Sequence, residues 1–263
     1  MVLNVTLSLA EQIGEVSRSA GRVIMDVYKT DFDVDEKSDD SPVTKADTEA
    51  EDLIFRRIRE GITGEFPLVG EEAVSQGKIP NVGNKPFWLI DPLDGTKEFI
   101  SRSGDFTVNI ALIENGIPVL GVVHIPFTDD TYLATRAGVF VQYGGAGRAI
   151  QISCRHAPKD GLTAVASKNH LTEETEAYLA RLPIKETINV GSSLKFCRVA
   201  EGKADVYPRF GPTMEWDTAA GHAVLMYAGG EIINEDGSPL QYGKAGFKNP
   251  NFIARGPGVP DTA

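Results

Sequence analysis

Apolar residues recur at helical spacing in the first part of the chain. Between residues 3 and 28 they return every three or four positions, which predicts one long amphipathic helix. Thr44, followed three residues later by Asp47, matches the pattern of a capped helix start, and the apolar positions after it predict a second helix that ends near Glu60. Residues 31–41, between these helices, are strongly acidic and hold few apolar side chains, so we expect an exposed loop there.

The middle of the chain has the pattern of β-strands. Residues 106–113 and 117–125 are apolar and rich in β-branched side chains, and they are joined at Asn115-Gly116, a pair that favours tight hairpins. Residues 131–135 and 139–143 continue the same pattern. We therefore expect an antiparallel meander in this region.

From about Cys154 onwards, the pattern changes to strands that alternate with helices. The predicted strands are residues 162–167, 185–190, 204–207 and 232–233, and the predicted helices are residues 172–181, 194–201 and 218–228. This change predicts an α+β subdomain over residues 1–150 and an α/β subdomain over residues 151–263. Helices and sheets are then expected to stack in layers.

Composition and charge narrow the class of protein. The chain has 263 residues, of which 41% are hydrophobic and 24% charged, as in a globular protein with a substantial core. The net charge of -11 argues against non-specific binding to nucleic acid or to an anionic membrane. Charged residues interrupt the apolar pattern at the N-terminus, so neither a signal peptide nor a membrane span is expected. Cys154 and Cys197 lie far apart, which favours a reducing compartment, the cytoplasm.

The stretch from Asp91 to Thr96 carries the strongest chemical signal. It follows the apolar run 87–90 and places the carboxylates of Asp91 and Asp94 three residues apart around a turn, where both can share a hard cation. Gly95 and Thr96 come next, where a helix would begin, and their N–H groups would be able to hold phosphate oxygens. Metal ligands beside a phosphate cradle indicate metal-assisted phosphate chemistry.

Further acidic residues stand at the ends of other apolar segments. Glu71 and Glu72 follow the run 66–69, and Asp217 precedes a helix of small residues. Taken singly, Asp217 has the position of a helix cap worth ~1 kcal/mol, and the two glutamates suit a solvated loop. If Glu71 and Asp217 converge with the two aspartates of the turn, four carboxylates in one crevice cost several kcal/mol unless cations neutralise them. A ligand set of oxygen atoms without histidine favours Mg²⁺ or Mn²⁺ over zinc.

Four motifs occur in a characteristic order along nearly the whole chain. They are Thr44–Asp47, Gly70–Glu72, Trp88–Thr96 and Trp216–Asp217. This set resembles the signature of the inositol monophosphatase superfamily of Mg²⁺-dependent, Li⁺-sensitive phosphatases. The resemblance implies the layered αβαβα sandwich of the sugar-phosphatase type, in which α+β and α/β parts are combined.

Three further stretches refine the resemblance within that superfamily: residues 97–100, 191–197 and 207–213. They are most similar to the bacterial CysQ-type 3'(2'),5'-bisphosphate nucleotidases. This implies a phosphoric monoester hydrolase that converts adenosine 3',5'-bisphosphate to AMP and phosphate in sulfate assimilation. It also implies a second substrate, 3'-phosphoadenosine 5'-phosphosulfate, converted to adenosine 5'-phosphosulfate. Two alternatives stay open: an inositol 1-phosphate or sugar-phosphate phosphatase of the same fold, and a binding factor with incidental catalysis.

The resemblance also implies roles for the acidic residues. One metal ion is held by Glu71, Asp91 and the backbone carbonyl of Leu93, and a second by Asp91, Asp94 and Asp217, with a third, weaker ion near Glu71. Two or three Mg²⁺ ions are thus expected, with Mn²⁺ as a substitute and Li⁺ and Ca²⁺ as inhibitors. The catalytic residues are Asp47, Thr96 and Glu71, of which Asp47 and Thr96 orient and deprotonate the attacking water. The alternative for Asp47 is that it only caps a helix.

Residues that contact the substrate follow from the same resemblance. They are Glu71, Leu93, Asp94, Gly95, Thr96, Ser193, Lys195, Arg209 and Asp217. Lys195 and Arg209 are the candidates for the 5'-phosphate, and the alternative for both is a solvated surface charge. Ser193, or its neighbour Ser192, would add a hydroxyl contact. His170 is similar to a histidine near the nucleotide in this family, although the surrounding motif departs from the usual pattern.

The expected partner is therefore a small molecule, a bisphosphorylated adenine nucleotide, and not a nucleic acid. Glu72 has two open interpretations, support for Glu71 or solvation in a loop. The chain is expected to be a monomer or homodimer. It is expected in the cytoplasm, although relatives associate with the inner membrane at its periphery.

Overall fold

Two long helices form the first layer of the computed structural model, which describes residues 3–37, 42–145, 147–166 and 172–261. They are α1 (Leu7–Tyr28) and α2 (Lys45–Gly61), and both were predicted from their apolar spacing. α1 begins at Leu7 and not at residue 3, because the hydroxyl of Thr6 accepts a hydrogen bond from the N–H of Leu9 (3.2 Å) and caps the helix there.

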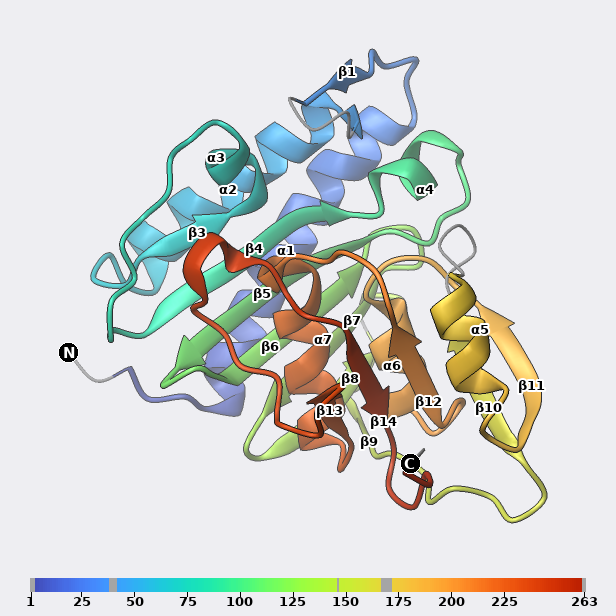
Figure 1. Ribbon diagram of the computed structural model, residues 1–263. Coiled ribbons are helices and arrows are strands. Elements are labelled where there is room, and N and C mark those ends of the chain that lie inside the picture. Colours follow the sequence, from blue (N-terminus) through green and yellow to red (C-terminus); the bar gives the residue numbers. More distant parts are fainter. Residues whose placement is uncertain (1–2, 38–41, 146, 167–171, 262–263) are drawn as a thin grey trace.

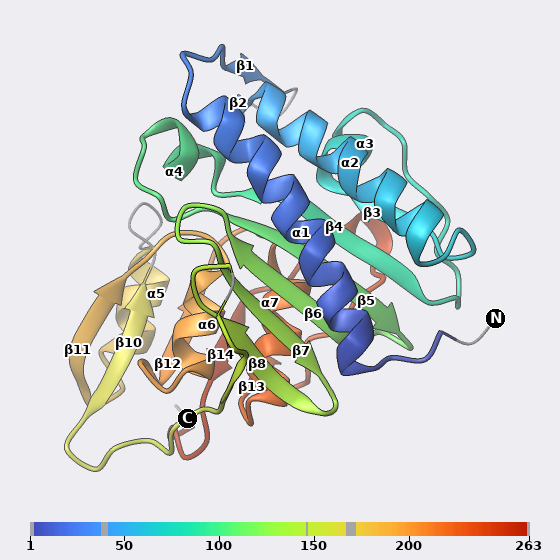
Figure 2. The ribbon, with the colours of Figure 1, turned by 180° about the vertical axis from the view of Figure 1, so that it is seen from behind.

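The two helices cover one face of a seven-stranded sheet (Figures 1 and 2). In spatial order its strands are β3 (Leu68–Gly70), β4 (Phe87–Asp94), β5 (Thr107–Glu114), β6 (Ile117–Ile125), β7 (Asp130–Thr135), β8 (Gly138–Gln142) and β9 (Ile150–Ile152). β3 and β4 are parallel, and every other neighbouring pair is antiparallel. The antiparallel meander predicted from the sequence is confirmed.

Both faces of this sheet are buried, which explains the continuous apolar runs. Along β4, the side chains of Trp88 and Ile90 pack against α1 and α2, whereas those of Phe87 and Leu89 belong to the core on the opposite side. Successive residues of a strand point to opposite faces, so a strand covered on both sides needs apolar residues at every position.

The middle layer consists of α6 (Leu194–Ala200) and α7 (Glu215–Tyr227), which lie between the two sheets (Figure 1). α7 approaches the first sheet very closely. A Cβ atom added to Gly121 of β6 would lie 2.5 Å from the Cβ of Ala223 and 2.6 Å from the carbonyl oxygen of Ala220. The small residues noted in the sequence therefore allow α7, with Asp217 in its first turn, to lie directly against the sheet.

A five-stranded sheet and one helix complete the layers. The strands, in spatial order, are β11 (Ile184–Asn189), β10 (Leu162–Ala166), β12 (Val206–Arg209), β14 (Phe252–Arg255) and β13 (Glu231–Asn234). Tyr178 of α5 (Glu173–Leu179) packs with Leu162 and Phe210 on the outer face. Helix, sheet, helix, sheet and helix thus alternate, and the predicted αβαβα sandwich is confirmed. β14, which lies between β12 and β13 in this sheet, was not predicted from the sequence.

Short elements connect these layers. They are β1 (Asp35–Glu36), β2 (Pro42–Val43), α3 (Glu71–Ser75), α4 (Thr96–Ile100) and the 3₁₀ turn η1 (Ala245–Phe247). The core between the sheets draws on residues before and after position 150, so the two predicted subdomains share one interior. Their boundary stays a prediction. In the part of the chain that the structure describes, no helix is both long and apolar enough to span a bilayer.

Candidate active site

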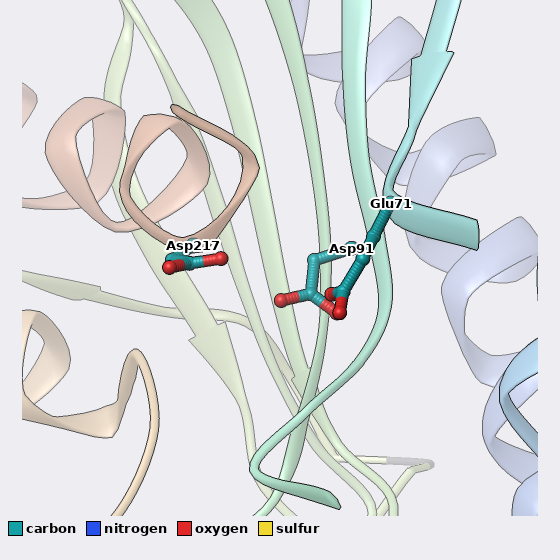
Figure 3. A group of neighbouring side chains, drawn as sticks. All are labelled: Glu71, Asp91 and Asp217. Carbon is teal, nitrogen blue, oxygen red and sulfur yellow. The ribbon is translucent and has the colours of Figure 1, made fainter. Parts of the chain in front are cut away.

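Three carboxylates from different elements converge beside the first sheet. Glu71 is the first residue of α3, Asp91 lies on β4 and Asp217 lies in the first turn of α7, and each offers an oxygen within 4.8 Å of the others. Figure 3 shows the carboxylates of Glu71 and Asp91 next to each other, with Asp217 facing them from the end of its helix. The convergence expected from the sequence is thus present in the fold.

The electrostatics of this cluster favour a bound cation. Burial, followed by the charges of neighbouring carboxylates, raises the pKa of Asp91 and that of Asp217 well above the ordinary aspartate value. Burial also raises the pKa of Asp94 to about 6, although the charge of Lys195 opposes the shift. Hard divalent cations bind such clustered oxygen ligands and relieve their repulsion. The residues therefore fit the metal ions that the sequence implies.

Asp94 lies in the same cavity but is held by different partners. Its Oδ2 accepts hydrogen bonds from the N–H of Ser193 (2.5 Å), the amide of Asn109 (3.3 Å) and the hydroxyl of Thr107 (3.4 Å). The hydroxyl of Ser193, predicted to contact substrate, is hydrogen-bonded to Asn109 (2.7 Å) and lies 2.8 Å from that of Thr107. Ser193 therefore links Asp94 to β5, and its contact with substrate stays a prediction.

The turn after Asp91 brings Leu93 to the lining of the cavity. The N–H of Leu93 donates to Oδ1 of Asp91 (3.0 Å), while the Leu93 side chain is buried among the core residues. Gly95 adopts the left-handed conformation (φ 94°, ψ 42°), which reverses the chain so that α4 begins at Thr96. The hydroxyl of Thr96 then lies 3.3 Å from the Leu93 carbonyl oxygen.

Asp47 both caps α2 and contacts Thr96. Its Oδ2 accepts hydrogen bonds from the N–H (2.8 Å) and the hydroxyl (2.7 Å) of Thr44, which completes a capping box. Its Oδ1 accepts a hydrogen bond from the hydroxyl of Thr96 (3.1 Å). Burial raises the pKa of Asp47 to about 6. The cap and the pairing with Thr96 are therefore compatible, and the geometry does not require a choice between them.

Lys37 is a site residue that the sequence did not indicate. Its Nζ atom lies 2.6 Å from a carboxylate oxygen of Glu71 and 2.7 Å from one of Glu72, and its side chain is only 7% exposed. Burial opposes its charge, but the two glutamates outweigh burial and raise the pKa of Lys37. The expectation of an exposed loop over residues 31–41 is wrong at Lys37, because these ion pairs bury it. Glu72 is also buried, so its interpretation as a solvated residue is wrong.

Lys195 and Arg209 line the same cavity as the carboxylates. Lys195 is buried, its Nζ donates to the carbonyl of Ser192 (2.7 Å), and burial lowers its pKa to about 8. The guanidinium of Arg209 donates to the carbonyl of Pro212 (3.1 Å), while its buried Nε has no hydrogen-bond partner within the described residues. For Lys195, the alternative of a solvated surface charge is therefore wrong.

One cavity of about 290 Å³ brings together every predicted metal-binding and substrate-binding residue, which suits a small ligand. These residues are Glu71, Asp91, Leu93, Asp94, Gly95, Thr96, Ser193, Lys195, Arg209 and Asp217. Asp47 does not line the cavity and reaches it through Thr96. His170 lies outside the described residues.

The segment after α7 fixes the start of that helix. The buried carboxylate of Glu215 accepts hydrogen bonds from the N–H groups of Gly243 (2.7 Å) and Lys244 (2.9 Å). The side-chain amide of Asn249 donates to the carbonyl of Met214 (2.8 Å). α7 begins at Glu215, earlier than the predicted start at residue 218, so Asp217 lies inside its first turn.

In metal-free buffer, the free energy of unfolding is expected to fall as the pH rises from about 5 to 7. Burial raises the pKa of both Glu51 and Glu72 to about 7, whereas unfolded glutamate titrates near pH ~4.3. The folded chain therefore holds more protons on these groups in this window, and each of them loses about 2 kcal/mol of stabilisation. Asp47 and Asp94 act in the same direction, because burial raises the pKa of each to about 6.

His124 and His222 oppose this trend in part. Burial lowers their folded pKa to about 3, whereas unfolded histidine titrates near pH ~6.5, so the unfolded chain holds more protons on them. Lys195 acts mainly above the window, since burial lowers its pKa to about 8.

Urea unfolding at the two pH values, in EDTA and in Mg²⁺, measures this effect. Mg²⁺ should make the fall smaller, because a cation beside Glu71 removes part of the repulsion that raises the pKa of Glu51 and Glu72. A free energy of unfolding in EDTA that stays constant or rises over this window would contradict the prediction.

Known proteins are similar to this chain over nearly its whole length. A model of the inositol monophosphatase family matches residues 8–257. The chain is 43% identical over 247 residues to the 3'(2'),5'-bisphosphate nucleotidase CysQ of Escherichia coli, covering 93% of this chain and 98% of that protein. Among solved structures, CysQ from Bacteroides thetaiotaomicron is similar at 40% identity and a TM-score of 0.80, covering 95% and 97% of the two chains. An inositol monophosphatase from Anabaena is similar at 25% identity and a TM-score of 0.75, covering 95% and 91%.

Proposed function

Because the chain belongs to the inositol monophosphatase family, we propose that it is a metal-dependent 3'(2'),5'-bisphosphate nucleotidase. Its main substrate is adenosine 3',5'-bisphosphate, which it hydrolyses to AMP and phosphate. A second substrate is 3'-phosphoadenosine 5'-phosphosulfate, and both belong to sulfate assimilation. The identity to proteins named as such nucleotidases supports this choice over other activities of the same fold.

The carboxylate cluster is assigned to Mg²⁺. Glu71, Asp91 and the Leu93 carbonyl would hold one ion, and Asp91, Asp94 and Asp217 a second, with a third near Glu71. The oxygen-only ligands and the raised pKa values of Asp91 and Asp217 support this assignment. When bound, such ions polarise the phosphoryl oxygens and stabilise the leaving oxygen. Mn²⁺ would substitute, and Li⁺ and Ca²⁺ would inhibit.

Asp47 and Thr96 are assigned to the attacking water. The hydroxyl of Thr96 donates to Asp47 (3.1 Å), so its oxygen lone pairs are free to accept a hydrogen bond from water. Asp47, whose pKa is about 6, is ionised at neutral pH and accepts the proton that Thr96 passes on as it takes one from water. The water oxygen then bonds to phosphorus as the bond to the 3' oxygen breaks, and the 3' oxygen leaves with the bonding electron pair and takes a proton from solvent to become the 3'-hydroxyl of AMP.

Lys195 and Arg209 are assigned to the second phosphate of the substrate. The observation that carries the choice of a bisphosphate is that these two cations share one cavity with the carboxylate cluster. The buried Nε of Arg209 is an unused donor, and Arg and Lys are the usual partners of phosphate. A substrate with one phosphate at the carboxylates and another at the cations would satisfy both groups, whereas a monophosphate would leave the cations unpaired.

Lys195→Met should lower kcat/KM for adenosine 3',5'-bisphosphate by roughly 10- to 100-fold, the value of a hydrogen bond to a charged group. The activity on adenosine 3'-phosphate, which lacks the 5'-phosphate, should change little. Methionine keeps most of the packing of this buried side chain. Phosphate release from both substrates measures the ratio.

Lys185→Met is the matched control, because Lys185 is exposed on β11 and pairs with Asp160 away from the cavity. Equal losses on both substrates would remove Lys195 from the 5'-phosphate site. A higher kcat/KM of the unmodified protein for inositol 1-phosphate than for the bisphosphate would refute the proposed substrate.

A further inference from the structure

Glu51 is a buried carboxylate of α2 that belongs to none of the sequence motifs. Its side chain contacts the segment that carries Glu71. One oxygen accepts a hydrogen bond from the N–H of Glu72 (2.9 Å) and the other from the N–H of Ala73 (2.8 Å). These N–H groups lie in the first turn of α3, where a helix offers no carbonyl partners of its own. Glu51 thereby fixes the residues that follow Glu71.

The same carboxylate also restricts which residue can stand directly before Glu71. A Cβ atom added to Gly70 would lie 2.2 Å from Oε2 of Glu51 and 2.6 Å from its Cδ, so only glycine allows this approach. The backbone of Gly70 is extended (φ −116°, ψ 149°), which any residue can adopt. The glycine of this motif is therefore explained by its contacts with Glu51 and with the ring of Phe55, whose Cζ would lie 2.8 Å from that Cβ, and not by its own conformation.

Asp47 precedes Glu51 by four residues, so both side chains lie on one face of α2. Asp47 contacts Thr96, whereas Glu51 contacts the segment around Glu71. The turn between the two carboxylates is part of one regular helix, and helices are rigid at this length scale. This face of α2 therefore sets where Glu71 stands relative to Asp47 and Thr96.

We propose that Glu51 is a positioning residue that holds Glu71 in the metal centre. The inference rests on the proposed function, since it takes Glu71 to be a metal ligand. Removing the charge and one acceptor oxygen of Glu51 would release the first turn of α3 and let Glu71 move. Residues that orient a metal ligand typically contribute ~10- to 100-fold to metal affinity. A merely structural Glu51 would affect stability and leave metal affinity unchanged.

Calorimetric titration of the metal-stripped full chain with Mn²⁺ tests the proposal. Glu51→Gln should weaken Mn²⁺ binding by about 10-fold or more at a temperature where circular dichroism shows it folded. Glu49→Gln is the matched control, because Glu49 lies on the same helix, is 45% exposed and pairs with Lys45. Its Mn²⁺ affinity should equal that of the unmodified chain. An unchanged affinity in folded Glu51→Gln would overturn the proposal.

Activity provides a second readout. In Glu51→Gln the Mg²⁺ concentration for half-maximal activity should rise, kcat should recover at saturating Mg²⁺, and KM for adenosine 3',5'-bisphosphate should stay constant. If Glu51→Gln does not fold, Glu51→Asp serves instead, since it keeps the charge but withdraws the oxygens by one methylene group. Wild-type Mn²⁺ affinity in Glu51→Asp would then count against the proposal, and a loss would support it.

Asp91→Asn separates this inference from the proposed function. If Asp91→Asn binds Mn²⁺ like the unmodified chain, the metal centre itself is wrongly assigned. If Asp91→Asn loses Mn²⁺ binding while folded Glu51→Gln retains it, the metal centre stands and only the positioning role of Glu51 fails.

Discussion

Asp91→Asn is expected to lower kcat for adenosine 3',5'-bisphosphate by about 1,000-fold or more, while making the metal-free protein more stable. Asp91 is assigned to both metal ions, and losing several kcal/mol of transition-state stabilisation gives a factor of this size. Its charge is buried beside Glu71, Asp94 and Asp217, all of which raise its pKa. A neutral amide removes that repulsion, and its oxygen can keep the hydrogen bond from the N–H of Leu93.

The two effects have separate measurements and one control. Phosphate release at saturating Mg²⁺ measures kcat, and thermal unfolding in EDTA measures stability. The control is Asp205→Asn, because Asp205 is also buried but pairs with Arg155 through two hydrogen bonds (2.8 and 2.7 Å) outside the cavity. That substitution should destabilise the protein and leave kcat nearly unchanged. Near-normal turnover of Asp91→Asn at saturating Mg²⁺ would contradict the ligand assignment.

Thr96→Val should lower kcat by about 100- to 10,000-fold, the usual contribution of acid–base catalysis, with little change in KM. Valine has nearly the shape of threonine and the same branching, so α4 should still begin at this residue. Only the hydroxyl that donates to Asp47, and that we propose to contact the attacking water, is lost. Asp47 keeps its two hydrogen bonds from Thr44 and should stay in place.

Steady-state kinetics of three variants distinguish this role from a packing effect. Thr96→Ser keeps the hydroxyl and should retain most of the activity. Thr48→Val makes the same substitution at a residue of α2 whose hydroxyl donates to the backbone carbonyl of Lys45, and it should behave like the unmodified chain. If Thr96→Ser is as inactive as Thr96→Val, the hydroxyl is not the group that matters.

The parts of the fold that could be predicted are those in which local pattern and tertiary environment agree. β5 and β6 are buried on both faces, so their apolar runs and the Asn115-Gly116 turn both indicate a hairpin of two buried strands. β14 shows the opposite case. Its four residues are flanked by prolines and have no distinctive pattern of their own, and their strand forms because β12 and β13 pair with them.

The same distinction holds within the site. Asp91 and Asp94 follow an apolar segment and Asp217 precedes a helix of small residues, and these positions together with the family resemblance indicated a common cavity. Lys37 and Glu51 carry no such signal. Each is one of several charges in a polar segment, and a charge in a polar segment is usually solvated. Their importance arises from partners far along the chain, Glu71 for Lys37 and the first turn of α3 for Glu51.

The fixing of α7 by the segment after it has a consequence for biosynthesis. During translation, Glu71 and Asp91 leave the ribosome well before Asp217. Asn249, which donates a hydrogen bond to the residue before α7, leaves the ribosome after all three. β14 then has to enter between β12 and β13 before the second sheet is complete. A nascent chain can therefore form the first sheet with an incomplete ligand set. The complete ligand set therefore requires that nearly the whole chain has left the ribosome.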